Sequence, residues 1–452
     1  MKIHDSKLKK KIEFKPLEEG KLSMYVCGPT VYDRAHLGHG RSAVSFDIIR
    51  KYFIYKGFDV KYVSNYTDID DKMINRAAEE KITVAELADK IIPMYEEDYG
   101  KLGIMPPDVQ PRATEYAEAN IGIIEKLEKN GYTYVLDDGV YFDVAKFPAY
   151  GEFSGQSLED LKMGARVCVV EAKRNPYDFV LWKFKKEGEP SWPSPWGEGR
   201  PGWHIECSSM IWKELGEKLD IHGGGLDLKF PHHECEVAQS VGAFGEGAFA
   251  QHWMHNGFIN VDNEKMSKSL GNFFTLKDVF EKYDPQVVRL MFLQTHYRNP
   301  INFSDVLLEQ AKSALERLHG FVRRLESING DAGNEYGLKE MFEESMDNDL
   351  DSSGALGAVF DLAKAVNTDL DNGKNVNGKA ILEELRAVDQ VLGVVFPEEA
   401  GDLDAEVEAL IAEREEARKN KDFEKADKIR GELNEKGIVL EDSKGGVIWK
   451  KR

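Results

Sequence analysis

The stretch that most constrains the fold is residues 24–41, MYVCGPTVYDRAHLGHGR. A short apolar run ends at Cys27, and the loop that follows carries His36 and His39. The next residues, 43–53, are amphipathic with helical spacing. A strand, a glycine-bearing turn and a helix in this order place backbone N–H groups and a helix N-terminus at one edge of a sheet, where phosphates bind. The stretch therefore predicts a nucleotide site.

Length and composition indicate an ordinary globular protein of several domains. A chain of 452 residues exceeds a single hydrophobic core, so we expect roughly two to four domains. The chain is 42% hydrophobic and 31% charged, without low-complexity tracts. Its net charge of −20 argues against non-specific coating of nucleic acid. A local basic face that meets one defined RNA stays possible.

No targeting or membrane segment is indicated. The basic N-terminus lacks the apolar core of a secretory signal, and we find no run of about 18 apolar residues. We therefore expect a soluble, cytoplasmic protein that does not bind membranes. In that compartment cysteines are more often free thiols or metal ligands than disulfides; the chain has Cys27, Cys168, Cys207 and Cys235.

The order of predicted elements indicates a parallel sheet interrupted by an insertion. Residues 21–65 read as strand, helix and strand, with Gly57 ending the helix. Residues 72–130 are mostly helical, and a hairpin turning at Asp138-Gly139 follows. After a region rich in Gly, Pro and Trp, the sheet resumes near Trp203, with Gly223–Gly225 as a loop at the end of its next strand.

A polar cluster, residues 65–72 (NYTDIDDK), follows the second predicted strand. In an open parallel sheet this position faces the ligand crevice. A helix N-cap followed by acidic first-turn residues explains the same spacing equally well.

Two further motifs suit phosphate binding, although each is weak alone. His36-Leu37-Gly38-His39 stands between a predicted strand and helix, whereas histidines three residues apart are usually structural or bind metal. Lys265-Met266-Ser267-Lys268-Ser269 suits a mobile loop closing over phosphates, but it also suits an ordinary solvated loop. Together, the two segments can enclose a nucleotide from both sides.

HLGH and KMSKS in this order resemble the signature pair of class I aminoacyl-tRNA synthetases. The segments MYVCGPTVYD, NYTDIDDK, GWHIECSSM, HGGGLDLKFPHHE and EKMSKSLGNFF resemble cysteinyl-tRNA synthetases, and the likeness runs the whole chain. The resemblance and the element order together predict an α/β fold. A Rossmann-like parallel-sheet catalytic domain split by an insertion would precede an α-helical bundle and a small α+β C-terminal domain.

The predicted boundaries follow this scheme. They are 1–120 for the first catalytic half, 121–200 for the inserted connective module, 201–284 for the second half with the KMSKS loop, 285–398 for the stem-contact region and helical anticodon-binding bundle, and 399–452 for the small anticodon-binding domain.

The resemblance implies one zinc ion per chain, held by Cys27, Cys207, His232 and Glu236. The residues are compatible with this, because His232 and Glu236 stand one helical turn apart and can reach one ion. Cys235 is also one turn from His232 and is a softer ligand than a carboxylate. We keep Glu236, because the family pattern has a carboxylate there. Cysteine and serine differ by one atom, so a pocket that reads shape alone separates them poorly. A zinc ion would instead bind the thiolate of cysteine in preference to the hydroxyl of serine.

The resemblance also implies the chemistry and its residues. ATP, with Mg²⁺, and L-cysteine would form cysteinyl-adenylate, and the 3′ adenosine of tRNA-Cys would receive the cysteinyl group. Positioning and charge stabilisation would supply the rate. The implied catalytic residues are His36, His39, Lys265 and Lys268, with Gly38, Gly40 and Lys268 at ATP; Thr67, Trp203, His222 and Asp227 would line the cysteine and adenylate pocket.

Trp449, beside three basic residues, would stack on an anticodon base. A tail tryptophan that covers a small hairpin core fits equally well. We expect a monomer. Two rivals remain: a ligase that passes cysteine to a small amine, whose relatives lack much of this C-terminus, and a degenerate paralogue that binds RNA or senses zinc.

Overall fold

The computed structural model describes residues 1–156, 172–261, 264–265, 274–328, 333–397, 405–420, 422–435, 438–443 and 446–451. The chain forms two compact units, Met1–Val395 and Phe396–Arg452. Among the described residues, no helix has the length and apolarity needed to cross a membrane.

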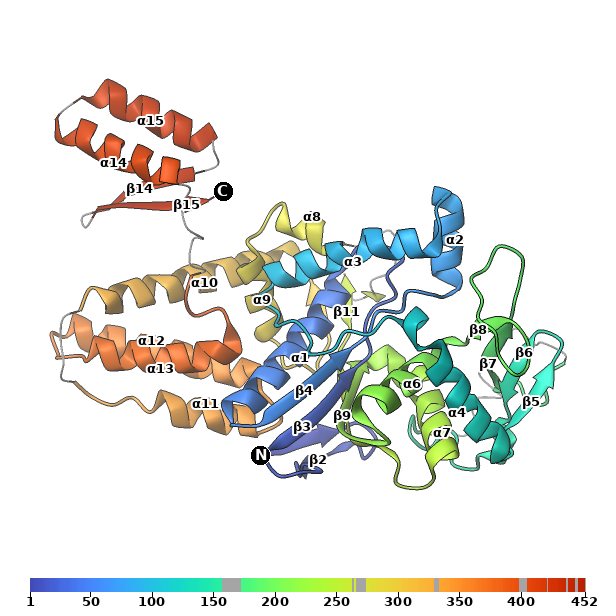
Figure 1. Ribbon diagram of the computed structural model, residues 1–452. Helices are drawn as coiled ribbons and strands as arrows, with labels where there is room; N and C mark the ends of the chain where they lie inside the picture. Colours follow the sequence, from blue (N-terminus) through green and yellow to red (C-terminus); the bar gives the residue numbers. More distant parts are fainter. Residues whose placement is uncertain are drawn as a thin grey trace. The chain divides into compact units, whose positions relative to one another are not determined.

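The first unit is built on a four-stranded parallel sheet with the strand order β10–β9–β3–β4 (Figure 1). Its strands are β3 (Lys21–Val26), β4 (Asp59–Ser64), β9 (Lys218–Gly225) and β10 (Phe249–Asn256). β3 pairs with β9, so the two halves of the predicted catalytic domain share one sheet. Their carboxyl ends therefore meet at one edge, which in open α/β sheets is the ligand edge.

Helices connect these strands as the sequence predicted. α1 (Leu37–Tyr55) crosses from β3 to β4, and Gly57 follows it with φ of 87°. α6 (Trp203–Leu215) ends at Gly216 before β9, and α7 (His232–Phe244) joins β9 to β10. The α/β class with a parallel-sheet catalytic core is thus confirmed.

Two predicted turns are wrong in detail. Gly223–Gly225 continue β9 instead of forming a loop. A Cβ at Gly223 would lie 2.4 Å from the Phe46 ring of α1, so the glycine is needed for packing and not for a turn. The hairpin β5–β6 turns at Asp137-Asp138, and Gly139 is the first residue of β6. A Cβ at Gly139 would lie 2.3 Å from the carbonyl oxygen of Trp182. Both glycines allow close packing across the fold.

The region between β4 and α6 contains helices and an antiparallel sheet. The helices are α2 (Asp71–Glu80), α3 (Val84–Lys101) and α4 (Ala117–Lys129). The sheet consists of β5 (Thr133–Leu136), β6 (Gly139–Phe142), β7 (Phe179–Phe184) and β8 (Gly199–Pro201). Asp70 caps α2 by accepting from the Met73 N–H at 2.7 Å. The polar cluster at 65–72 therefore serves both as strand end and as helix cap.

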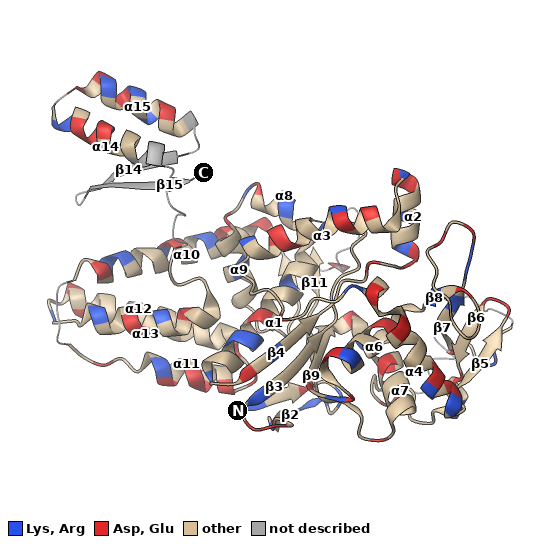
Figure 2. Cartoon of the chain, viewed as in Figure 1, with Lys and Arg blue, Asp and Glu red and all other residues tan. Residues whose placement is uncertain are grey.

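A helical region follows the second catalytic half. Its helices are α8 (Leu276–Phe280), α9 (Pro285–Leu293), α10 (Asp305–Glu326), α11 (Leu338–Asp347), α12 (Ser352–Asp371) and α13 (Gly378–Leu392). A small sheet of β11 (Ile259–Val261), β12 (Glu264–Lys265) and β13 (Ile301–Phe303) precedes the longer helices. Figure 2 shows basic and acidic residues interspersed along α10, α11 and α13. These helices bury leucine, valine and phenylalanine between them.

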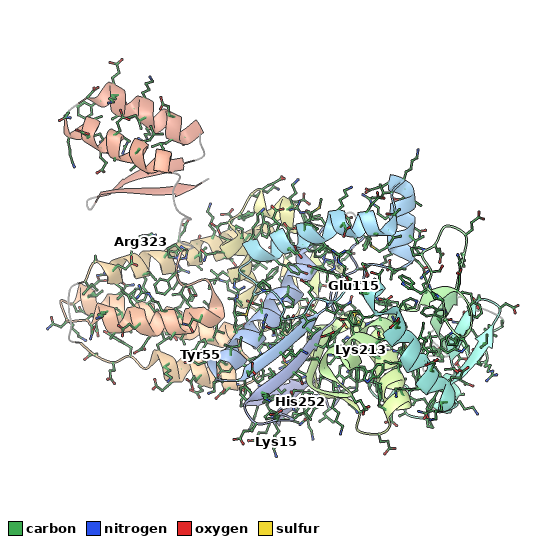
Figure 3. The ribbon with its side chains drawn as sticks, viewed as in Figure 1. Lys15, Tyr55, Glu115, Lys213, His252 and Arg323 are labelled. Atoms are coloured by element: carbon green, nitrogen blue, oxygen red, sulfur yellow. The ribbon has the colours of Figure 1, made fainter. Side chains whose placement is uncertain are left out.

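The N-terminus packs beside the central sheet. It forms a hairpin of β1 (Lys2–Asp5) and β2 (Lys10–Glu13). Figure 3 shows Lys15 next to His252 of β10, whose Nε2 lies 3.2 Å from the Lys15 carbonyl oxygen.

The second unit contains α14 (Ala405–Lys419), α15 (Phe423–Glu435) and a hairpin of β14 (Ile438–Ser443) and β15 (Gly446–Lys451). Helices and a hairpin together agree with the small α+β C-terminal domain that the sequence predicts.

Candidate active site and metal centre

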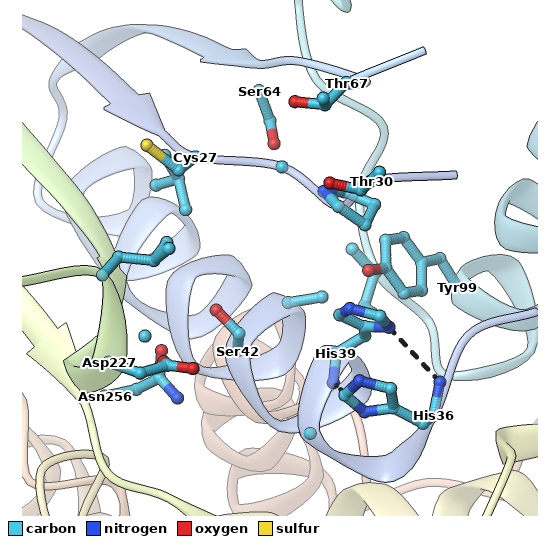
Figure 4. A pocket seen from close by; sticks show the side chains of 18 of the residues that line it. Cys27, Thr30, His36, His39, Ser42, Ser64, Thr67, Tyr99, Asp227 and Asn256 are labelled. Atoms are coloured by element: carbon cyan, nitrogen blue, oxygen red, sulfur yellow. Dashed lines mark hydrogen bonds between the residues drawn. The ribbon is translucent and has the colours of Figure 1, made fainter. Parts of the chain in front are cut away.

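A cleft of about 380 Å³ opens at the carboxyl ends of the central strands (Figure 4). Its walls come from both halves of the catalytic region. The predicted site residues that line it are Cys27, His36, Gly38, His39, Thr67, Trp203, Cys207, Asp227 and His232. Figure 4 shows Cys27 and the two histidines on opposite sides of the cleft. The fold thus gathers residues that are widely separated in the sequence.

Four donor side chains converge at the Cys27 side. One ligand atom each from Cys27, Cys207, His232 and Glu236 lies within 4.8 Å of the others. The two sulfur atoms are 3.7 Å apart and form no disulfide. His232 Nε2 lies 2.9 Å from Glu236 Oε1. These groups come from three parts of the sheet and its helices. Cys27 follows β3, Cys207 lies on α6, and His232 and Glu236 lie one turn apart on α7.

The charges of this cluster suit a cation. A hydrogen bond from the Cys27 thiol lowers the pKa of Cys207 to about 6, while burial raises the pKa of Cys27. Although burial opposes it, His222 and His232 hold the pKa of the Glu236 carboxyl well below its usual range. The set therefore carries negative charge in a buried place, where a metal ion would compensate it. Two thiols, an imidazole and a carboxylate are donors that zinc accepts.

A second possible metal set overlaps the first. It consists of Cys27, His222, His233 and Glu236. Cys235 belongs to neither set, and its Sγ lies 3.4 Å from the Tyr150 hydroxyl inside an apolar core. Burial raises the pKa of Cys235 above its usual range, and its place in this apolar core, apart from the converging donors, suits packing.

The two signature histidines cap α1. The His39 N–H donates to His36 Nδ1 at 3.3 Å, and the His36 N–H donates to His39 Nδ1 at 3.4 Å. Their rings stack with centroids 3.6 Å apart. Because each Nδ1 accepts a hydrogen bond, each neutral ring carries its proton on Nε2. The pair therefore offers donors beside the positive end of the α1 dipole.

Besides the predicted ligand Glu236, which is buried, two predicted residues that the structure describes in full lie away from the cleft surface. His222, predicted to line the cysteine pocket, is fully buried, and its Nε2 lies 2.8 Å from Glu236 Oε2. Gly40, predicted at ATP, packs against α8, where a Cβ would lie 2.9 Å from Leu276. Neither residue borders the cleft itself, and their predicted roles stay predictions.

Three predictions fall on parts that the structure does not describe. Lys268 lies outside the described residues. Lys265 is described only as backbone of β12, and Trp449 only as backbone of β15. Their predicted roles stay predictions.

The structure also adds residues that sequence reasoning missed. The Asn65 side chain accepts from the Gly28 N–H at 2.9 Å and lies 3.8 Å from Cys207 Sγ. Tyr95 of α3 places its hydroxyl 3.2 Å from His39 Nδ1. His204 Nδ1 lies 3.0 Å from His232 Nδ1. The polar cluster at residues 65–72 already contained Asn65, whereas no sequence pattern around Tyr95 indicated that it lies at His39.

Comparisons with known proteins cover nearly the whole chain. Residues 13–313 match the model of the class I (C) tRNA synthetase catalytic domain, 341–396 a DALR domain, and 400–449 a cysteinyl-tRNA ligase anticodon binding domain. A cysteine–tRNA ligase of Clostridioides difficile (strain 630) is 48% identical over 465 aligned positions that span all of both chains.

Solved structures resemble the fold at low identity. A Mycobacterium tuberculosis methionyl-tRNA synthetase with methionyl-adenylate superposes with a TM-score of 0.61 at 14% identity, covering 83% of this chain and 88% of that one. A leucyl-tRNA synthetase from Agrobacterium radiobacter K84 gives 0.59 at 12%, covering 85% of each chain.

Proposed function

This chain belongs to the class I cysteinyl-tRNA synthetases, and we propose how its cleft divides the work of that reaction. The chain ligates cysteine to tRNA. We assign selection of the amino acid to the metal cluster and activation by ATP to the helix that begins at His36. The observation that carries this division is that both groups border one cleft.

Cys27, Cys207, His232 and Glu236 would hold a zinc ion. Bound zinc supplies a soft Lewis acid that prefers a thiolate over a hydroxyl group. Trp203 stacks on the His232 ring with centroids 4.5 Å apart and lines the cleft, so it would cover the cysteine side chain. Thr67 and Asp227 would hold the rest of the amino acid, since both line the same space.

The α1 N-terminus would bind the phosphates of ATP. His36 and His39 would donate from Nε2 as charge develops on the α-phosphate during attack by the cysteine carboxylate. Gly38, which lines the cleft, would let the phosphates approach the backbone. Lys265 and Lys268 would hold the β- and γ-phosphates, and Mg²⁺ would arrive with ATP.

The C-terminal regions would hold tRNA-Cys. The match of residues 400–449 to an anticodon binding domain supports this assignment, and we place Trp449 at an anticodon base. The enzyme would work as a cytoplasmic monomer.

Two measurements test the proposal. Cysteine-dependent ATP–pyrophosphate exchange followed by transfer to tRNA tests the reaction, and exchange without transfer would point to a small-amine ligase instead. Zinc content and cysteine affinity test the site: Glu236→Ala should lose both, while Cys235→Ala should keep both. A Glu236→Ala variant with normal zinc and cysteine binding would overturn the ligand assignment.

A further inference from the structure

Helix α3 carries two fully buried polar side chains that reach the histidine motif at the start of α1. Tyr95 and Asp98 stand three residues apart, so they lie on one face of α3. The Tyr95 hydroxyl lies 3.2 Å from His39 Nδ1. Asp98 binds Arg34, which precedes His36 by two residues. Buried polar groups are stable only with partners, so these contacts hold the motif against α3.

The direction of the Tyr95 hydrogen bond follows from its surroundings. The backbone N–H of His36 can only donate, and it donates to His39 Nδ1 at 3.4 Å. This nitrogen therefore carries a lone pair and no proton, and the Tyr95 hydroxyl is the donor. Burial raises the pKa of Tyr95 well above its usual value, so the hydroxyl keeps the proton that it donates. The neutral His39 ring then holds its own proton on Nε2.

The ion pair of Asp98 with Arg34 holds the loop that leads into α1. Arg34 Nε donates to one carboxylate oxygen at 2.9 Å, and Nη2 donates to the other at 2.8 Å. Two parallel hydrogen bonds from a planar guanidinium fix orientation as well as distance. The Asp98 side chain is fully buried and that of Arg34 is 18% exposed. α3 thus holds the chain just before the motif as well as a ring within it.

Backbone hydrogen bonds fix the path of the chain through the same loop. The Leu37 N–H donates to the Phe274 carbonyl at 3.1 Å, and the Leu276 N–H donates to the Ala35 carbonyl at 2.9 Å. Such bonds set the backbone, but a side chain can still rotate about its own bonds. The hydroxyl of Tyr95 contacts the His39 ring itself and therefore restrains that rotation.

We propose that Tyr95 is a positioning residue for the activation step: its hydroxyl donates to His39 Nδ1 and keeps the Nε2 proton directed at the phosphates of ATP. Asp98 and Arg34 support it by holding the loop to α3. Tyr95 itself does not line the cleft. The inference rests on the proposed function, in which His39 stabilises charge on the α-phosphate.

Tyr95→Phe tests the proposal, because it removes the hydroxyl and keeps the ring. In cysteine-dependent ATP–pyrophosphate exchange kcat should fall roughly three- to tenfold, the usual effect of one lost hydrogen bond. KM for cysteine should stay the same, because the amino acid would be held at the Cys27 side, across the cleft from the histidines (Figure 4). Arg34→Lys keeps the charge but loses the two parallel bonds, and it should also lower kcat without changing KM for cysteine.

His39→Gln separates positioning of the ring from a general structural effect. Glutamine keeps a terminal N–H donor but has no acceptor nitrogen at the place of Nδ1. Tyr95→Phe should therefore lower kcat in the parent enzyme and leave it unchanged in His39→Gln, the non-additivity expected of two residues in contact. The same fold-loss in both backgrounds would overturn the inference.

Two control variants address the hydroxyl group and the stability of α3. Tyr116→Phe removes a hydroxyl that lies 2.6 Å from Glu214 Oε1 and should leave kcat unchanged. Leu87→Ala cuts a fully buried side chain of α3 and should lower the urea midpoint without lowering kcat of the folded enzyme. An unchanged kcat in Tyr95→Phe, or an equal loss in Leu87→Ala, would overturn the inference. A parent enzyme without cysteine-dependent exchange would instead refute the proposed function.

Discussion

Substitution of His222 tests the geometry of the proposed metal centre most directly. Glu236 is fully buried, and each of its oxygens has a partner. Oε1 faces His232 Nε2 at 2.9 Å and Cys27 Sγ at 3.5 Å, while Oε2 faces His222 Nε2 at 2.8 Å. His222→Phe keeps a ring against Trp253, on which His222 stacks at 4.5 Å, but it removes the donor to Oε2.

The expected cost follows from this arrangement. The carboxylate would lose a buried hydrogen bond and with it a fixed orientation toward the other ligands. Loss of such supporting contacts lowers metal affinity about 10- to 100-fold, which corresponds to about 1.4 to 2.7 kcal/mol. His222→Gln, which keeps an N–H donor, should lose less.

Zinc affinity is measured by competition with a chromogenic chelator, on protein whose unfolding in urea is recorded in parallel. The cysteine-to-serine preference in pyrophosphate exchange should fall with the affinity. If His222→Phe binds zinc as tightly as the parent, Glu236 does not depend on His222, and the geometric argument fails.

Three further predictions concern stability, pH dependence and tRNA charging. Gly223→Ala should destabilise the fold by about 1 to 3 kcal/mol through overpacking, and Phe46→Leu should recover part of this in urea unfolding; no recovery would locate the strain elsewhere. Burial lowers the pKa of His255 to about 3, so the unfolded chain takes up the proton first and stability falls as pH drops below about 6.5. His255→Gln should remove about 2 kcal/mol of that loss between pH 7 and 5, measured by urea unfolding in chelator; an unchanged slope would contradict it. Trp449→Ala should weaken tRNA charging and spare pyrophosphate exchange; if both fall together, Trp449 is structural.

Local patterns were enough to predict the main architecture. The strand, loop and helix around Cys27 depend on near neighbours, as does the helix stop at Gly57, and the structure confirms both. The family resemblance added the function and class, which the comparisons confirm. The predicted ligands come close together in the fold, although their binding of zinc remains a prediction.

The predictions fell short where contacts between residues far apart in the sequence determine the local structure. Gly223 was read as a loop, because glycine repeats usually are, but the Phe46 ring of α1 requires a glycine inside the strand. No sequence pattern shows that His222, predicted at the substrate, has its Nε2 2.8 Å from Glu236 Oε2; its role at the substrate stays a prediction. The Asp138-Gly139 turn was shifted by one residue for a similar reason: Gly139 accommodates Trp182 of a strand much later in the chain. Each case is a tertiary contact that local spacing cannot encode.

The segment from Cys27 to His36 connects the two ends of the cleft and helps to set the distance between them. The Cys27 N–H donates to the Gly223 carbonyl at 3.1 Å, which holds this residue to β9. The Thr67 N–H donates to the Pro29 carbonyl at 3.0 Å, and the Val31 N–H to the Thr67 carbonyl at 3.2 Å, which hold the loop to the end of β4. Because the loop is bonded to the ends of two strands of one sheet, it ties the proposed metal ligands at Cys27 to the capped end of α1. An amino acid bound by its sulfur at one end would therefore bring its carboxylate to a set distance from the phosphates at the other. Selection of the amino acid and its activation by ATP would then depend on the same stretch of backbone.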